Sequence, residues 1–189
     1  MWVFILRFPS LFEPYWYGDE GVYQTLGLAM NNGSLLYQDI WDNKPPLLYM
    51  IYSFFGSDQF AVRLTSLIFG ILSIFVFFKL ANKIFGNIKI ALFSTAFFAL
   101  FFGSPLLEGN IANAENFMVL PILTSALILL NIKETTETKK TQNRNILFIF
   151  LSGIILGLAL LFKIVALFDF AAFLVFAALF IDEKFSKEC

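Results

Sequence analysis

The sequence predicts an all-α polytopic membrane protein with about six transmembrane helices, the first of them truncated, and an external loop that carries amphipathic helices. Of its 189 residues, 59% are hydrophobic and 14% are charged, and the mean hydropathy is +0.77. Soluble domains are about 45–50% apolar and about 25% charged, and one of this size could not bury so much apolar surface. The apolar residues also gather in runs that match the length of a membrane span.

Five apolar runs, separated by short polar stretches, are the candidate full spans. They cover residues 62–80, 88–102, 117–132, 146–162 and 165–181. Residues 1–12 are apolar but form only about half a span, and Arg7 and Pro9 interrupt them. We interpret this segment as the outer end of a first helix whose beginning is missing. We therefore expect residues 1–189 to be the N-terminal part of a larger transmembrane domain, and a fragment of a longer protein.

Charge distribution predicts which loops face the cytoplasm, because Lys and Arg accumulate in short cytoplasmic loops. Most basic residues fall on alternate loops, namely Lys79, Lys83, Lys89, Lys133, Lys139, Lys140, Arg144, Lys184 and Lys187. The remaining loops hold most of the acidic residues. We predict that residues 133–145 form a cytoplasmic loop, that residues 13–59 form the first external loop, and that the acidic chemistry faces the external side of the membrane.

Composition excludes several classes of function. There is no His, which excludes Ser-His or Cys-His nucleophiles and the common zinc sites. The net charge is −1 without a basic stripe, so we expect no nucleic-acid partner. Acid–base chemistry must therefore use Asp, Glu, Lys or Tyr. No cofactor is required by the sequence; a divalent cation, with Asp19 as a ligand, is the one cofactor considered.

A short amphipathic helix is predicted to begin at Gly18-Asp19-Glu20 and to end at Asn31-Asn32-Gly33, with Val22, Leu26, Ala29 and Met30 as its apolar positions. Such a helix lies in the membrane interface. Asp19 is either its N-cap or a catalytic carboxylate. Neighbouring residues project about 100° apart on a helix, so only one of Asp19 and Glu20 is expected in the site, with the other supporting it.

Lys44 precedes Pro45 and Pro46. Proline forces the residue before it into an extended conformation and suits the first position of a helix. Lys44 therefore stands next to a helix start, where an ammonium group and free backbone N–H groups favour an anion such as phosphate. The alternative, that Lys44 reaches the lipid headgroups by snorkelling, is equally compatible with the spacing.

Glu115 belongs to an acidic, amide-rich turn at residues 108–116. It either caps the helix that follows or faces the same external cavity as Asp19.

Together these motifs resemble the GT-C superfamily, specifically the protein O-mannosyltransferase and lipid A aminoarabinose transferase group. The resemblance rests on Asp19-Glu20 with Tyr23, on Asp42-Asn43-Lys44-Pro45-Pro46, on Arg63-Leu64, on Glu115 and on the Gly-rich run at 153–163. It implies a glycosyltransferase that takes a sugar from a polyprenyl-phosphate donor at the external membrane face. The acceptor is a hydroxyl of a protein, lipid or glycan.

The resemblance also implies roles for individual residues. Asp19 and Glu20 would be catalytic, Lys44 and Arg63 would bind the donor phosphate, and Tyr23, Asp42 and Glu115 would support the acceptor side. The aminoarabinose transferases have Glu-Lys before proline where this chain has Asn43-Lys44. A metal or acceptor contact made by that Glu has no counterpart here, and Asp42 is the candidate substitute.

The sequence favours inverting transfer by a single displacement over two alternatives. A transporter or lipid flippase places ionisable residues near the membrane midplane, whereas here only Lys163 and Asp169 lie deeper than the external edge. A structural membrane subunit would not need the external acidic cluster.

Overall fold

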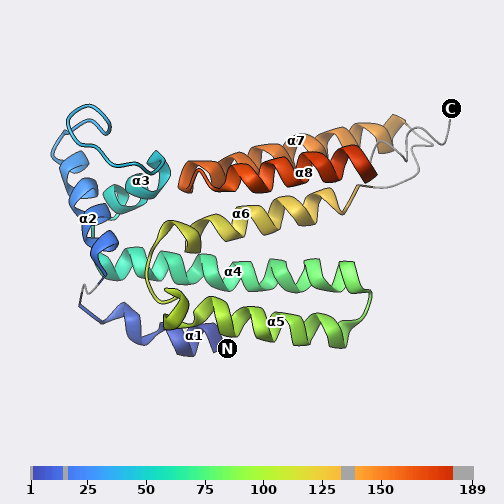
Figure 1. Ribbon diagram of the computed structural model, residues 1–189, viewed down its shortest axis with the longest axis horizontal. Coiled ribbons are helices and arrows are strands. Elements are labelled where there is room, and N and C mark those ends of the chain that lie inside the picture. Colours follow the sequence, from blue (N-terminus) through green and yellow to red (C-terminus); the bar gives the residue numbers. More distant parts are fainter. Residues whose placement is uncertain (1, 15–16, 133–138, 181–189) are drawn as a thin grey trace.

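The computed structural model describes residues 2–14, 17–132 and 139–180, and Figure 1 shows their arrangement. Every named element within these ranges is a helix, which confirms the all-α prediction. The only β-type pairing among the described residues is an isolated bridge between Leu36 and Ile40.

Five long helices run roughly parallel to one another and alternate in direction (Figure 1). They are α4 (Gln59–Phe85), α5 (Ile88–Gly103), α6 (Ala114–Leu129), α7 (Lys139–Phe162) and α8 (Ala166–Phe180). The alternation places the α4–α5 turn at one end of the bundle. Residues 104–113 and the α7–α8 turn lie at the other end, which agrees with the partition of basic and acidic loops in the sequence.

Two helical segments are long and apolar enough to cross a membrane, Gln59–Phe85 and Thr141–Phe162. Three more apolar helices are shorter, at Ile88–Gly103, Ala114–Leu129 and Ala166–Ala177. The predicted number of about six spans is therefore not confirmed. Large apolar side chains such as Phe93 and Phe168 are more than 60% exposed on the helix surfaces, which is expected where lipid is the solvent.

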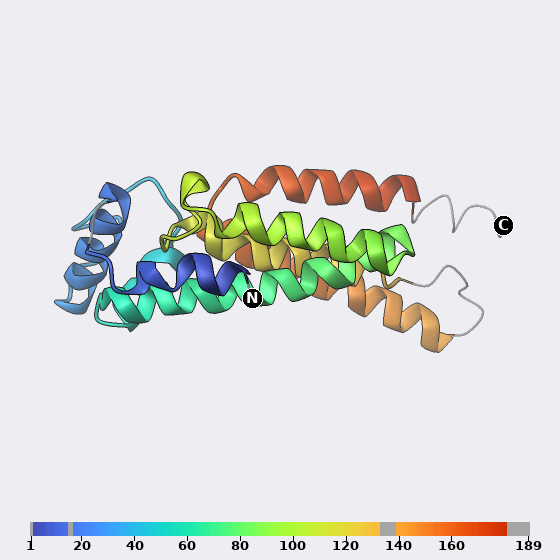
Figure 2. The ribbon, with the colours of Figure 1, turned by 90° about the horizontal axis from the view of Figure 1, so that it is seen from below.

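The first predicted helix is short and tightly packed. Helix α1 (Trp2–Arg7) and the 3-10 turn η1 (Pro9–Leu11) lie beside α4 and α5, as Figure 2 shows. Arg7 is buried here, and its guanidinium donates to Ser66 Oγ at 2.6 Å. Gly70 makes this possible, because a Cβ at that position would lie 2.8 Å from Arg7 Nη1.

The loop predicted at residues 133–145 is shorter than expected. Helix α7 begins at Lys139, so residues 139–145 are helical, while residues 133–138 lie outside the described part of the chain. The stretch has no apolar period, but Lys, Gln and Arg are good helix formers and extend α7 beyond its apolar part. The side of the membrane on which this segment lies stays a prediction.

Two short helices, α2 (Gly18–Asn31) and α3 (Pro46–Phe54), pack on each other at the end of the bundle where α4 begins. The predicted start and end of α2 are confirmed. Its buried face agrees in part with the predicted one, because Leu26 is buried, whereas Val22 is 47% exposed and Tyr23 is 1% exposed. Gly27 lets α3 approach closely, since a Cβ there would lie 2.8 Å from Tyr52 Cβ.

This fold predicts that the α2–α3 end and the α4–α5 turn face opposite sides of the membrane. In a Cys189→Ser background, we expect an impermeant thiol reagent applied to intact cells to modify Asn32→Cys and to spare Lys89→Cys. Both positions are exposed, so access across the membrane is the variable. Modification of Lys89→Cys without modification of Asn32→Cys would show that the orientation is the opposite of the predicted one. Equal modification of both would contradict the prediction that the bundle spans the membrane.

Candidate functional site

The centre of the candidate site is an ion pair between α2 and the segment that leads into α3. Lys44 Nζ lies 3.0 Å from Asp19 Oδ2, and the Tyr23 hydroxyl donates to the same oxygen at 2.9 Å. The Lys44 ammonium also lies 4.5 Å from the centroid of the Tyr23 ring, a cation–π arrangement. The side chain of Asp19 is 52% exposed while that of Lys44 is 20% exposed. A carboxylate open to solvent is therefore held by two donors that lie beneath it.

Asp19 is not the cap of α2. Tyr17 occupies the N-cap position and makes no side-chain cap hydrogen bond, and Asp19 lies within the first turn. The hydrogen bond from Lys44 is the largest influence on this carboxyl and lowers its pKa, so Asp19 is ionised at neutral pH. Burial and donation to Asp19 raise the pKa of Tyr23, so its hydroxyl remains a donor.

Local backbone geometry presents Lys44 to Asp19. Pro45 is the N-cap of α3 with an extended conformation (φ −63°, ψ 162°), and the helix begins at Pro46, one residue later than predicted. The Tyr37 hydroxyl donates to the Lys44 carbonyl at 2.6 Å and fixes the chain before the helix.

Asp42 supports this corner of the chain and is not joined to Asp19. Its Oδ2 accepts from the Tyr49 hydroxyl at 2.6 Å, and its Oδ1 accepts from the Asn43 N–H at 2.7 Å. The carboxylate thus fastens the segment before α3 onto α3 itself, and its predicted role beside the acceptor finds no support in these contacts.

Glu20 faces the opposite direction and forms a buried ion pair with Arg63 of α4. Each side chain is 1% exposed, and Arg63 Nη2 and Nε lie 2.6 Å and 3.1 Å from the two Glu20 oxygens. The N–H of Ala112 donates to Glu20 Oε1 at 2.8 Å. Arg63 Nη1 also donates to the carbonyl of Glu13 at 2.9 Å.

This burial bears on two sequence-based assignments. Neither Glu20 nor Arg63 reaches solvent, so the geometry supports neither a catalytic role for Glu20 nor a phosphate-binding role for Arg63. The physical reason is the 100° turn between adjacent helical residues, which directs Asp19 outward and Glu20 into the bundle. Glu20 is the supporting member of the pair.

Glu115 makes a second Lys–carboxylate pair. Asn113, not Glu115, caps α6, since its side chain accepts from the Asn116 N–H at 3.2 Å. Glu115 Oε1 instead accepts from Lys163 Nζ at the end of α7. The ammonium of Lys163 helps to lower the pKa of Asp19, and the Glu115 carboxylate helps to raise that of Tyr23. The two ion pairs therefore act on one another electrostatically.

Sequence reasoning did not place Lys163 or Tyr17 in the site. The signal for Lys163 was its position at the end of an apolar run that closes on the acidic side of the protein. Tyr17 donates to Glu108 Oε2 at 3.0 Å, and Asn113 Nδ2 lies 3.3 Å from the same oxygen. Burial, together with the hydrogen bond to Glu108, raises the pKa of Tyr17 to about 12.

The described part of the chain offers no cluster of three or more metal-ligating side chains. Among the residues that the structure describes, no group of three or more His, Cys, Asp or Glu side chains is placed to hold a metal ion. Asp19, considered as a ligand from the sequence, shares one oxygen between Lys44 and Tyr23.

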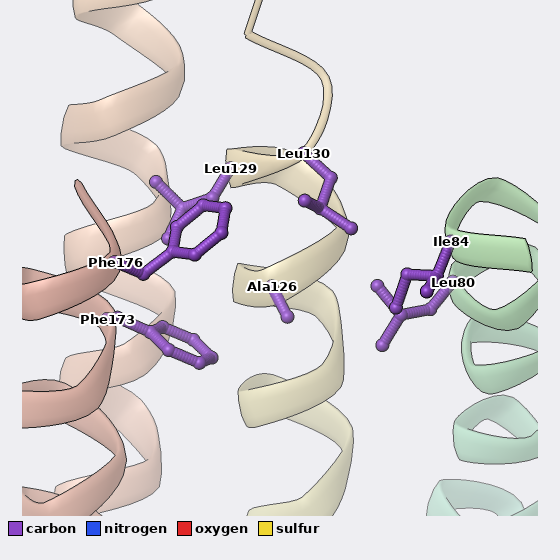
Figure 3. Close-up of a pocket in the computed structure, with 7 residues that line it drawn as sticks. All are labelled: Leu80, Ile84, Ala126, Leu129, Leu130, Phe173 and Phe176. Carbon is purple, nitrogen blue, oxygen red and sulfur yellow. The ribbon is translucent and has the colours of Figure 1, made fainter. Parts of the chain in front are cut away.

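Two apolar pockets differ in what surrounds them. One of about 410 Å³ lies among α3, α4, α6 and α7, with Leu47 and Phe162 in its lining. The other, of about 290 Å³, lies among α4, α6 and α8 and is shown in Figure 3. Its labelled side chains, including Phe173 and Phe176, are all hydrocarbon. It therefore offers no group for acid–base chemistry. Of these two pockets, only the first is also lined by α3 and α7, the helices next to Lys44 and Lys163 in the sequence.

The family of dolichyl-phosphate-mannose-protein mannosyltransferases matches residues 32–188, which is most of the chain. The chain belongs to this family. The resemblance to GT-C glycosyltransferases is thereby confirmed. No curated protein and no solved structure matches the chain.

The mannosyltransferase match includes only part of the candidate site. Lys44, Glu115 and Lys163 fall within residues 32–188, whereas Asp19 and Tyr23 precede them. The connection of α2 to the matched region comes from the structure, through the Asp19–Lys44 and Glu20–Arg63 ion pairs.

The buried pair predicts a large stability effect. Glu20→Gln keeps the shape of the side chain but leaves Arg63 buried without its counter-charge, so we expect a loss of about 3–5 kcal/mol in the free energy of unfolding. Denaturant titration of the protein in detergent would measure it. Glu13→Gln, at an exposed position, is the matched control and should change stability by less than about 0.5 kcal/mol. Equal stability of the two variants would contradict a structural role for the pair.

Proposed function

We propose that this chain carries the reaction centre of a glycosyltransferase that moves a sugar from a polyprenyl-phosphate donor to an acceptor hydroxyl at the external membrane face. The observation that carries the proposal is the Asp19–Lys44 pair, in which an accessible, ionised carboxylate is held beside an ammonium group. The reaction needs both groups, one to accept a proton and the other to stabilise a phosphate. Membership of the mannosyltransferase family supports the reaction class.

The proposed chemistry is a single displacement at the anomeric carbon. Asp19 accepts the proton of the acceptor hydroxyl as its oxygen forms the new glycosidic bond. The bond between the anomeric carbon and the phosphate oxygen breaks, and the phosphate leaves with the electron pair. Lys44 stabilises the negative charge on that phosphate. Attack opposite the leaving group inverts the anomeric configuration.

Neighbouring residues position these two groups. Tyr23 donates to Asp19 and supplies the ring beneath Lys44. The hydrogen bond from Tyr49 to Asp42 fixes the turn on which Lys44 lies. Glu115 and Lys163 set the charge around the site. No step in this scheme requires a metal ion.

The family description suggests which molecules to test first. It names dolichyl-phosphate mannose and a protein, so a polyprenyl-phosphate mannose is the first donor and a serine or threonine hydroxyl of a protein is the first acceptor. Lipid and glycan hydroxyls are the further acceptors to test.

Asp19→Asn is expected to lower the rate of transfer by about 10²–10⁴-fold, because the amide cannot accept the proton. Folding should be preserved, since Asp19 does not cap α2. The rate would be measured with the whole protein in nanodiscs and a saturating polyprenyl-phosphate sugar. Asp39→Asn, in the same loop and exposed, is the control and should keep the wild-type rate. Wild-type turnover by Asp19→Asn would exclude Asp19 as the base.

Lys44→Met is expected to weaken the binding of a polyprenyl phosphate by about 1.5–3 kcal/mol, the range of a hydrogen bond to a charged group. The dissociation constant would be measured by native mass spectrometry of the protein in nanodiscs. Lys79→Met, at the opposite end of α4, controls for a general loss of positive charge. If Lys44→Met and Lys79→Met bind the lipid equally well, Lys44 serves the membrane interface and not the donor.

A further inference from the structure

An apolar groove of about 410 Å³ is lined by residues of α3, α4, α6 and α7. Its lining includes Leu47, Ile51, Leu120, Ile155, Leu158 and Phe162. Thr124 also lines it, but its hydroxyl is occupied by the Leu120 carbonyl at 2.8 Å. The groove therefore suits a hydrocarbon chain and not a sugar.

Both lysines of the site are close in sequence to residues that line this groove. Lys44 lies three residues before Leu47, and Lys163 directly follows Phe162. The two lysines thus adjoin α3 and α7, two of the four helices that line the groove. Each is held by a carboxylate, Lys44 by Asp19 and Lys163 by Glu115.

This charge pattern fits an anion joined to an apolar chain. The two ammonium groups belong to residues close in sequence to a groove lined by hydrocarbon. Each carboxylate partner is only partly buried, with side-chain exposures of 52% for Asp19 and 45% for Glu115. A phosphate can therefore compete for the lysines without leaving a buried carboxylate unpaired. A neutral lipid would gain nothing from the lysines, and a small anion would gain nothing from the groove.

We propose that Lys163 is a second ligand of the donor phosphate, exchanging Glu115 for it, and that the groove between α3 and α7 takes the first prenyl units of the same lipid. The inference rests on the proposed function for the chemical class of the donor. It adds a binding residue and the place of the lipid chain. Withdrawal of Lys44 towards the phosphate would at the same time free Asp19 to act as a base.

The first test separates a ligand from a structural brace. The whole protein in phosphatidylcholine nanodiscs would be titrated with a long-chain polyprenyl phosphate, and Lys163→Met, Lys163→Arg and Glu115→Gln would be compared with Lys89→Met. We expect Lys163→Met to weaken binding about tenfold or more. Lys163→Arg should restore most of the affinity, and Glu115→Gln should bind as tightly as the wild type or more tightly. A lysine that only braces Glu115 would make Lys163→Met and Glu115→Gln equally poor, and this result would overturn the proposal.

The second test concerns the groove. Thr124→Trp would fill it, and Thr95→Trp is the matched control, because Thr95 makes the same kind of helical hydrogen bond, to the Ala91 carbonyl at 2.7 Å. We expect Thr124→Trp, but not Thr95→Trp, to weaken the binding of the long-chain polyprenyl phosphate. The two variants should bind dimethylallyl phosphate equally well. Equal binding of the long-chain lipid by the two variants would overturn this part. Inorganic phosphate and phosphatidylglycerol nanodiscs test the other sources of phosphate, and competition by either at the level of the polyprenyl lipid would also overturn it.

A transfer assay on the same samples separates this inference from the proposed function. If binding of the lipid depends on Lys163 but no sugar is transferred, the proposed lipid site is supported and the proposed enzyme activity is contradicted. If sugar is transferred but binding of the lipid does not depend on Lys163, the enzyme activity is supported and the role of Lys163 is contradicted.

Discussion

The buried Glu20–Arg63 ion pair is the constraint on which the rest of the site depends. Removal of two charges from water is costly, and such a pair persists only when its remaining hydrogen-bonding groups are satisfied. Glu20 accepts from two Arg63 nitrogens and from the Ala112 N–H. The pair therefore connects α2, α4 and the segment before α6. Asp19 directly precedes Glu20 on α2. Its position is therefore fixed by the Glu20–Arg63 ion pair, although Asp19 is not part of that pair.

The same arrangement explains how an exposed site can be well ordered. Tyr23, Tyr49 and Tyr52 pack edge to face between α2 and α3, with ring centroids 6.0 Å and 5.7 Å apart. Each hydroxyl has a separate task, because Tyr23 donates to Asp19, Tyr49 to Asp42 and Tyr52 to the Ala112 carbonyl. The aromatic rings supply apolar packing below, and their polar ends hold the carboxylates and the connecting chain above.

Much of the fold could be predicted from the sequence, and the site only in part. Apolar run length identified the five long helices, and the Gly18 and Asn31 signals set the limits of α2. Asp19 and Lys44 are 25 residues apart in the sequence, and a contact over such a separation cannot be predicted from hydrophobic periodicity. The resemblance implied a phosphate-binding role for Arg63, and the sequence does not decide whether a basic residue near an external loop faces outward or inward. Only the structure shows that Arg63 pairs with Glu20.

The central claim is that these groups perform an inverting transfer from a polyprenyl-phosphate sugar, and the stereochemistry of the product tests it most directly. Purified protein in nanodiscs would be given a polyprenyl-phosphate mannose of known anomeric configuration and a serine-containing peptide, and the product would be analysed by NMR. The account predicts a glycosidic bond of the opposite configuration to the donor. A product with retained configuration, or no transfer to any protein, lipid or glycan hydroxyl, would contradict it.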